Sequence, residues 1–92
     1  MPLEIDGMEI NYDKVPVPHM VGGVRRYLEN GIEPGHFLTA VITNDLGKAV
    51  AHGDSNNQAA LADWVRFFYN YTPRDCWGSR DIMEAWMRKR LS

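Results

Sequence analysis

The chain has 92 residues, 45% of them hydrophobic and 24% charged, with a formal net charge of −2 at pH 7. This length fits one globular domain over residues 1–92 and is too short for two separate cores. The single cysteine excludes an intramolecular disulfide framework, and the net acidity argues against a general DNA-coating protein.

The apolar stretches are far shorter than the roughly 20 residues that cross a bilayer. The amino terminus also lacks the basic and apolar segments of a signal peptide. We therefore expect a cytoplasmic protein with no membrane partner.

Residues 1–14 are expected to form a hairpin arm, and residues 18–91 a helical body. Residues 3–5 and 8–10 alternate apolar with polar around Asp6-Gly7, a pair that favours the positive φ angles of a tight turn. The prolines of residues 15–18 then favour an extended connection.

The first helix is predicted to end at Asn30-Gly31, and Met20, Val24, Tyr27 and Leu28 have the spacing of its apolar face. Its start is open at Gly22-Gly23. Glycine costs about 1 kcal/mol relative to alanine inside a helix, so either the helix begins after the pair or something approaches closely there.

A second helix is predicted from Pro34 to Gly53, with Pro34 in its first turn. On an uninterrupted helix Asp45 would fall on the apolar face, where a lone carboxylate is costly. Asp45 therefore either pairs with a cation or caps a new helical segment after a break at Asn44.

A third helix is predicted to start at a capping box of Ser55 and Gln58 and to end at Thr72-Pro73. Its core stripe is expected to be Leu61, Trp64, Val65 and Phe68. Phe67 and Tyr69 flank this stripe, which favours an interface in a homo-oligomer, with base stacking as the rival use.

A fourth helix follows Gly78-Ser79, with Ser79 as cap and Met83, Trp86 and Met87 as buried positions. Arg88, Lys89 and Arg90 suit its carboxyl end. The fold class is therefore mainly α: a small four-helix domain with a short amino-terminal β-hairpin.

The candidate ligand-binding residues are Arg25, Arg26, Tyr27, Asn44 and Asp45. Guanidinium groups beside backbone N–H groups at a glycine-rich helix start are suited to holding a phosphate. In the alternative, Arg25 neutralises Asp45 on the second helix. Tyr27 either adds a stacking surface or enters the core.

Neither a metal nor a cofactor is expected. His19, His36 and His52 have no carboxylate spacing that makes a metal set. Nothing around Cys76 resembles a nucleophile signature, and no set of nucleophile, base and orienting group is recognisable. We therefore expect a protein that binds and is not an enzyme.

Three blocks of the sequence form a recognisable pattern: Gly22-Gly23-Val24-Arg25-Arg26-Tyr27, residues 34–41 with Asn44-Asp45-Leu46, and Tyr69-Asn70 with Pro73, Cys76 and Gly78-Ser79. These blocks resemble small accessory proteins encoded by tailed bacteriophages and prophages. The resemblance covers roughly residues 15–87 and implies an accessory protein in an infected bacterial cytoplasm. It supplies no catalytic residues.

The resulting expectation is a homo-oligomeric, non-enzymatic phage binding protein. Its partner would be a small phosphorylated ligand, such as a nucleotide-type signal of host defence, or a host protein. The alternative is a small DNA-binding transcriptional regulator with Arg88, Lys89 and Arg90 on phosphates.

Overall fold

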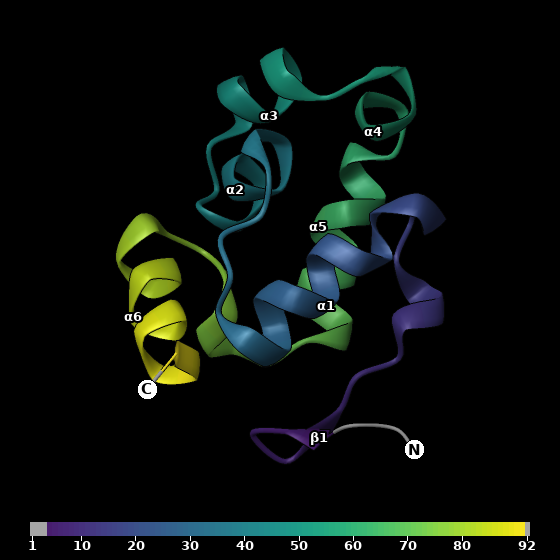
Figure 1. The fold of residues 1–92 in the computed structure, drawn as a ribbon. Helices are drawn as coiled ribbons and strands as arrows, with labels where there is room; N and C mark the ends of the chain where they lie inside the picture. Colours follow the sequence, from purple (N-terminus) through teal and green to yellow (C-terminus); the bar gives the residue numbers. More distant parts are fainter. Residues whose placement is uncertain (1–3, 92) are drawn as a thin grey trace.

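The computed structural model describes residues 4–91 and is mainly helical (Figure 1). A two-stranded hairpin of β1 (Glu4–Ile5) and β2 (Met8–Glu9) comes first. The α-helices are α1 (Val21–Asn30), α2 (His36–Ile42), α3 (Leu46–His52), α4 (Ser55–Ala59), α5 (Leu61–Tyr71) and α6 (Arg80–Leu91). Short 3-10 helices lie at η1 (Tyr12–Lys14), η2 (Pro18–Met20) and η3 (Arg74–Cys76).

The amino-terminal hairpin forms as predicted in the described residues, and Leu3, the first residue of its predicted strand, lies outside them. Asp6 and Gly7 have φ angles of 51° and 79°, and Ile5 pairs with Met8 across the turn. Ile5 is only 1% exposed and belongs to the hydrophobic core, while Asp6 forms an ion pair with Lys89 of α6 at 2.8 Å. The arm therefore packs against the helical body.

Both Gly22 and Gly23 lie inside α1. The helix therefore begins before the glycine pair, which the sequence had left undecided. It begins at Val21 and ends at Asn30, and the C-cap that follows, Gly31, has the left-handed conformation with a φ of 69°. A Cβ on Gly31 would lie 2.7 Å from the backbone oxygen of Met87, so this turn approaches α6 as closely as glycine permits.

The predicted second helix is two helices, α2 and α3, with a sharp corner between them. Asn44 has a φ of 61°, and the amides of Asn44 and Asp45 donate to the carbonyls of Val41 and Ala40, the bond pattern of a Schellman motif. Asp45 then caps α3 by accepting from the Lys48 amide at 3.1 Å. Of the two uses open to Asp45, capping is confirmed. Pro34 lies before the N-cap, Gly35, and so outside the helix.

The predicted third helix is also divided, because α4 ends at Ala59 and α5 begins at Leu61. The cap of α4 is Asp54, which accepts from the Asn57 amide at 2.8 Å. The predicted capping box is therefore wrong. The Gln58 side chain donates instead to the carbonyl oxygens of Val50 and Gly53 and so joins α3 to α4.

Helix α5 is at the centre of the core, as expected, but Val65, which was predicted to belong to its core stripe, is 41% exposed. Trp64 and Phe68 have no exposed surface, and the Trp64 indole donates to Asn57 Oδ1 at 3.2 Å. Phe67, predicted to flank the core, is 1% exposed and packs edge-on against Trp64. The expectation that Phe67 forms part of an interface is therefore wrong, since the core already covers its ring.

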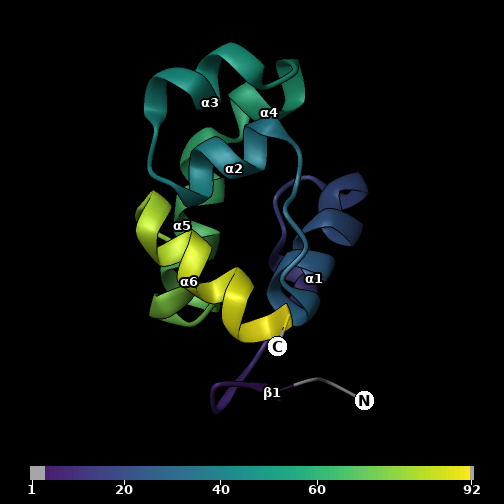
Figure 2. The same cartoon turned by 60° about the vertical axis from the view of Figure 1, so that its left-hand side comes forward.

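Helix α6 starts with the predicted cap, Ser79, which accepts from the Ile82 amide at 3.1 Å. Met83 and Trp86 are buried, and the Trp86 indole donates to the carbonyl oxygen of Tyr27 at 3.3 Å. Figures 1 and 2 show α6 beside α1 at the end of the molecule that carries the hairpin, with α3 and α4 at the opposite end.

Candidate functional site

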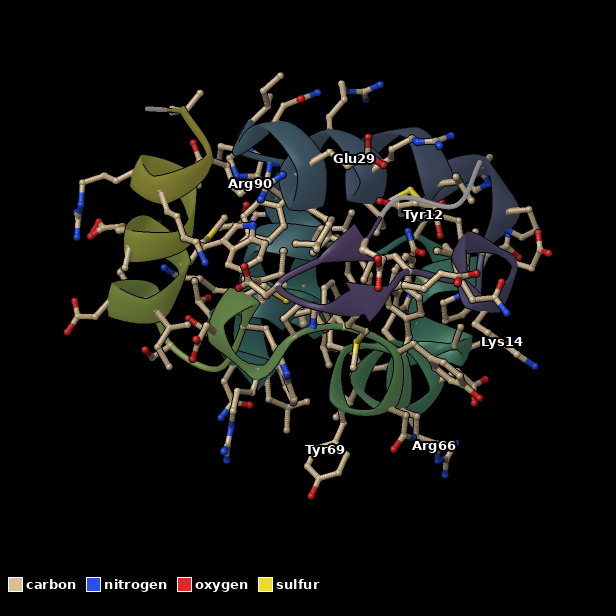
Figure 3. All side chains as sticks on the ribbon, turned by 90° about the horizontal axis from the view of Figure 1, so that it is seen from below. Tyr12, Lys14, Glu29, Arg66, Tyr69 and Arg90 are labelled. Atoms are coloured by element: carbon tan, nitrogen blue, oxygen red, sulfur yellow. The ribbon has the colours of Figure 1, made fainter. Side chains whose placement is uncertain are left out.

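Arg25 is paired within its own helix. Its Nε donates to Glu29 at 3.0 Å, and its guanidinium lies 5.0 Å from the centre of the Tyr12 ring. Tyr12 also donates to Glu29, at 2.8 Å, and Figure 3 shows these two labelled side chains together. The alternative in which Arg25 neutralises Asp45 is therefore wrong, because Glu29 is the partner one helical turn away.

Arg26 is exposed and folds back over the start of α1. A Cβ on Gly22 would lie 3.1 Å from Arg26 Nη1, so the absence of a side chain at Gly22 makes room for the guanidinium. Within residues 4–91, no side chain forms an ion pair or hydrogen bond with Arg26. Arg26 is the candidate from α1 that remains available to an anion.

Tyr27 lies in the core, the second of its two predicted uses. Its ring is 1% exposed, and its hydroxyl donates to the carbonyl oxygen of Cys76 at 2.7 Å. Burial raises the pKa of Tyr27 well above its ordinary value. The ring therefore offers no stacking surface in this conformation.

Asn44 and Asp45 lie apart from the arginines of α1. They line a small cavity of about 30 Å³ whose other walls come from α2, α3 and α5, and none of whose lining residues belongs to α1. The structure therefore does not bring the five candidate residues together into one site.

The three basic residues at the end of α6 do not share a face either. Lys89 pairs with Asp6, whereas the Arg90 Nε donates to the backbone oxygen of Glu29 at 3.1 Å and its guanidinium lies near the Trp86 ring. Arg88 lines a groove on another side of α6. Arg88, Lys89 and Arg90 therefore do not form a continuous phosphate-binding surface.

An open groove of about 570 Å³ lies where α5, η3 and the start of α6 meet. We call it the aromatic groove, and it is lined by Tyr69, Arg74, Asp75, Trp77, Gly78 and Ile82. Tyr69 is 76% exposed, and Figure 3 shows its side chain pointing away from the body of the protein. The groove therefore presents a large aromatic side chain to solvent.

The second aromatic wall of the groove is fixed in place. Trp77 packs against Phe68 of the core, with ring centres 6.1 Å apart, and meets the Tyr69 ring edge-to-face at 6.5 Å and 77°. Gly78 follows in a conformation with φ of 126°, and its amide donates to the carbonyl of Ile42 at 2.7 Å. This bond ties the loop to α2 and holds the indole against α5.

The groove carries one charge of each sign. Arg74 and Asp75 are adjacent in η3 and exposed, and among the described residues neither has a hydrogen-bond or ion-pair partner. Aromatic faces with a free guanidinium and a free carboxylate can hold a planar ring, an anion and a hydrogen-bond donor together.

Cys76 follows Asp75 in η3 and is fully buried. Its thiol contacts the Thr72 hydroxyl at 3.2 Å, and burial raises its pKa to about 12. The thiol therefore stays protonated at neutral pH, which is the unreactive form of cysteine.

The sequence indicated that Tyr69 is an aromatic residue outside the core, but it predicted no role for Trp77, Arg74 or Asp75. A usable signal was present, since an aromatic and two charged residues crowd the short loop between Pro73 and Gly78. The orientation of that loop depends on its bond to Ile42, which lies more than thirty residues earlier in the chain.

The described residues contain neither a metal-binding cluster nor a membrane-spanning helix. His36 and His52 stack at 5.2 Å between ring centres, but residues 4–91 contain no cluster of three His, Cys, Asp or Glu side chains suited to a metal ion. Within the same range, every helix is too short or too polar to cross a membrane.

Comparison with known proteins gives no match to a protein-family model, to a curated protein or to a solved structure.

Proposed function

We propose that the chain is a non-enzymatic binding protein that takes a nucleotide-type ligand into the aromatic groove. The main support for this proposal is the edge-to-face arrangement of the Tyr69 and Trp77 rings, with Arg74 in the same groove. Base stacking on an aromatic side chain contributes about 1–3 kcal/mol per base, and a guanidinium suits phosphate.

The polar groups of the groove support the same class of ligand. The Asp75 carboxylate can only accept hydrogen bonds when ionised, so it suits the amino or imino groups of a base and repels a phosphate. Arg74 next to it attracts the phosphate. The two residues thus favour one orientation, with the base toward Asp75 and the phosphate toward Arg74.

Among the described residues, the groove has no reactive thiol with which to form a covalent intermediate. The nearest thiol, that of Cys76, is buried and protonated. The resemblance to phage accessory proteins adds the proposed setting, in which the protein sequesters a nucleotide-type signal in the cytoplasm of an infected bacterium.

The groove is a better candidate than the cluster on α1 for a physical reason. Arg25 is already neutralised by Glu29, and the Tyr27 ring is covered, so that only Arg26 remains for an anion. One exposed arginine gives a weak and unselective site.

The proposal is tested by titrating mononucleotides, dinucleotides and a short DNA duplex into the protein, with calorimetry as the readout. We expect a nucleotide to bind and Tyr69→Ala to weaken it about tenfold or more, the equivalent of losing one stacked base. Arg74→Gln should also weaken binding, whereas Arg66→Gln, an exposed arginine paired with Asp63 elsewhere on α5, should not.

The double variant Arg25→Ala/Arg26→Ala separates the two candidate sites. Unchanged binding in that variant together with loss in Tyr69→Ala supports the groove. Loss in the double variant with unchanged binding in Tyr69→Ala moves the site to α1 and overturns the proposal. Binding of duplex DNA alone, or of nothing in the panel, also overturns it.

A further inference from the structure

A second groove, of about 480 Å³, lies on the side of α6 that faces the turn after α1. We call it the α6 groove, and it is lined by Gly31, Ile32, Glu33, Glu84, Met87, Arg88 and Leu91. Ile32 is 46% exposed and Leu91 is 67% exposed. Two large aliphatic side chains therefore project into solvent at a concave surface, a common feature of protein interfaces.

Within residues 4–91, two of the three charged side chains that line this groove, Glu84 and Arg88, are unpaired, whereas Glu33 has a partner. Arg80, one turn before Glu84, approaches Glu33 at 3.9 Å. In the described part of the chain, Glu84 and Arg88 have neither an ion-pair nor a hydrogen-bond partner. They lie one helical turn apart on the same face of α6, the glutamate nearer the amino terminus.

We propose that this groove binds a second copy of the chain, with the two α6 helices antiparallel about a twofold axis near residue 86. In that arrangement Glu84 of each copy faces Arg88 of the other, so one contact occurs twice, as a twofold interface requires. A parallel arrangement would instead place Glu84 against Glu84. When one of the two helices is reversed, each glutamate therefore lies opposite an arginine of the other copy.

The apolar and charged residues have different roles in this dimer. Met87, one residue from the axis, and Ile32 in the same groove bury aliphatic surface, which supplies most of the affinity. Exposed ion pairs add little affinity, but like charges in contact repel, so Glu84 and Arg88 select the partner and fix the register. This makes a second copy a better occupant than an unrelated apolar surface.

The α6 groove is independent of the proposed ligand site. Ile82, which lines the aromatic groove, lies on the opposite side of α6 from Glu84, because two residues of helix correspond to a rotation of about 200°. Dimerisation therefore leaves the aromatic groove open. The sequence-based expectation of a homo-oligomer is retained, but its interface moves from Phe67 and Tyr69 to α6.

The test is a set of charge reversals measured by sedimentation velocity across low to high micromolar concentration. We expect a dimer for the parent protein and self-association at least about tenfold weaker for Glu84→Arg and for Arg88→Glu, since each reversal creates two like-charge contacts. Mixing these two variants should restore a dimer, because the heterodimer regains two opposite-charge contacts. The double variant Glu84→Arg/Arg88→Glu should also dimerise.

Lys48→Glu on α3 is the matched control, because it changes the net charge by the same amount as Arg88→Glu. It should leave the dimer intact. Thermal unfolding followed by circular dichroism confirms that each variant is folded. A monomeric parent, a dimer that survives both single reversals, or a mixture that stays monomeric would each overturn the proposal.

Discussion

The Tyr27 hydroxyl donates a buried hydrogen bond of 2.7 Å to the backbone oxygen of Cys76, 49 residues away. The bond joins α1 to η3, the segment that carries Arg74 and Asp75. Because η3 also packs against α6, one tyrosine connects the first helix to the loop that builds the aromatic groove.

Tyr27→Phe should lower the free energy of unfolding by about 1–2 kcal/mol, because it leaves the buried Cys76 carbonyl without this donor. Urea denaturation measures the effect. Tyr69→Phe is the control, since Tyr69 is 76% exposed and should change stability by less than about 0.5 kcal/mol. Equal effects of the two substitutions would contradict the structural role of the bond.

Trp64→Ala should cost roughly 3–5 kcal/mol, because the side chain is fully buried and its removal leaves a large cavity. Val65→Ala, at the next position but 41% exposed, should cost less than about 1 kcal/mol. Denaturant unfolding of both variants checks the orientation of α5. A loss below about 1 kcal/mol for Trp64→Ala would show that this face of the helix is wrong.

Two glycine substitutions should act in opposite directions. Gly31→Ala should destabilise the protein by more than about 1 kcal/mol, because Gly31 has a φ of 69° and its new Cβ would lie 2.7 Å from the Met87 oxygen. Gly47→Ala should stabilise it by up to about 1 kcal/mol, because the position is helical and its nearest neighbour, an Asp45 oxygen, is 3.9 Å away. Thermal unfolding distinguishes the signs, and a stabilising Gly31→Ala would refute the close approach to α6.

Stability should fall at alkaline pH. Burial raises the pKa of Cys76 from about 9 to about 12, and burial also raises the pKa of Tyr27. Folded protein therefore holds these protons more tightly than the unfolded chain. Their contribution is fully present below pH 9 or so, and for Cys76 it declines as the pH rises from about 9 to about 12.

Urea denaturation at neutral pH and at about pH 10.5 measures this decline. In Cys76→Ala the loss between the two conditions should be smaller than in the parent, although the variant is less stable overall because of its cavity. An identical loss in both proteins would show that Cys76 does not contribute to it.

Features fixed by short-range geometry were predictable from the sequence. The Asp6-Gly7 turn, the Ser79 cap and the left-handed Gly31 each depend on the conformational preference of one or two residues. The break at Asn44 was one of two predicted alternatives for the same reason, since asparagine tolerates the left-handed conformation that a Schellman motif needs.

The candidate site was less predictable because exposure depends on what packs opposite each helix. Phe67 and Tyr69 were both predicted to flank the core stripe, yet in α5 neighbouring aromatic rings cover Phe67 and leave Tyr69 open. Arg25 is a different case, because Glu29 lies four residues later, a spacing that by itself indicates a pair within one helix, whereas the sequence-based alternative considered only Asp45.

The sequence by itself determined a mainly helical chain with an amino-terminal hairpin, most helix ends and the central position of Trp64 and Phe68. Hydrophobic periodicity and capping act within a few residues, so they are readable from the order of amino acids. Tertiary structure alone decided which of its two predicted uses Tyr27 takes, that Phe67 is covered while Tyr69 is open, and that Tyr69 and Trp77 form a groove with Arg74. Those outcomes depend on contacts between segments far apart in the chain, such as Gly78 with Ile42 and Tyr27 with Cys76, whose geometry exists only once the helices have packed.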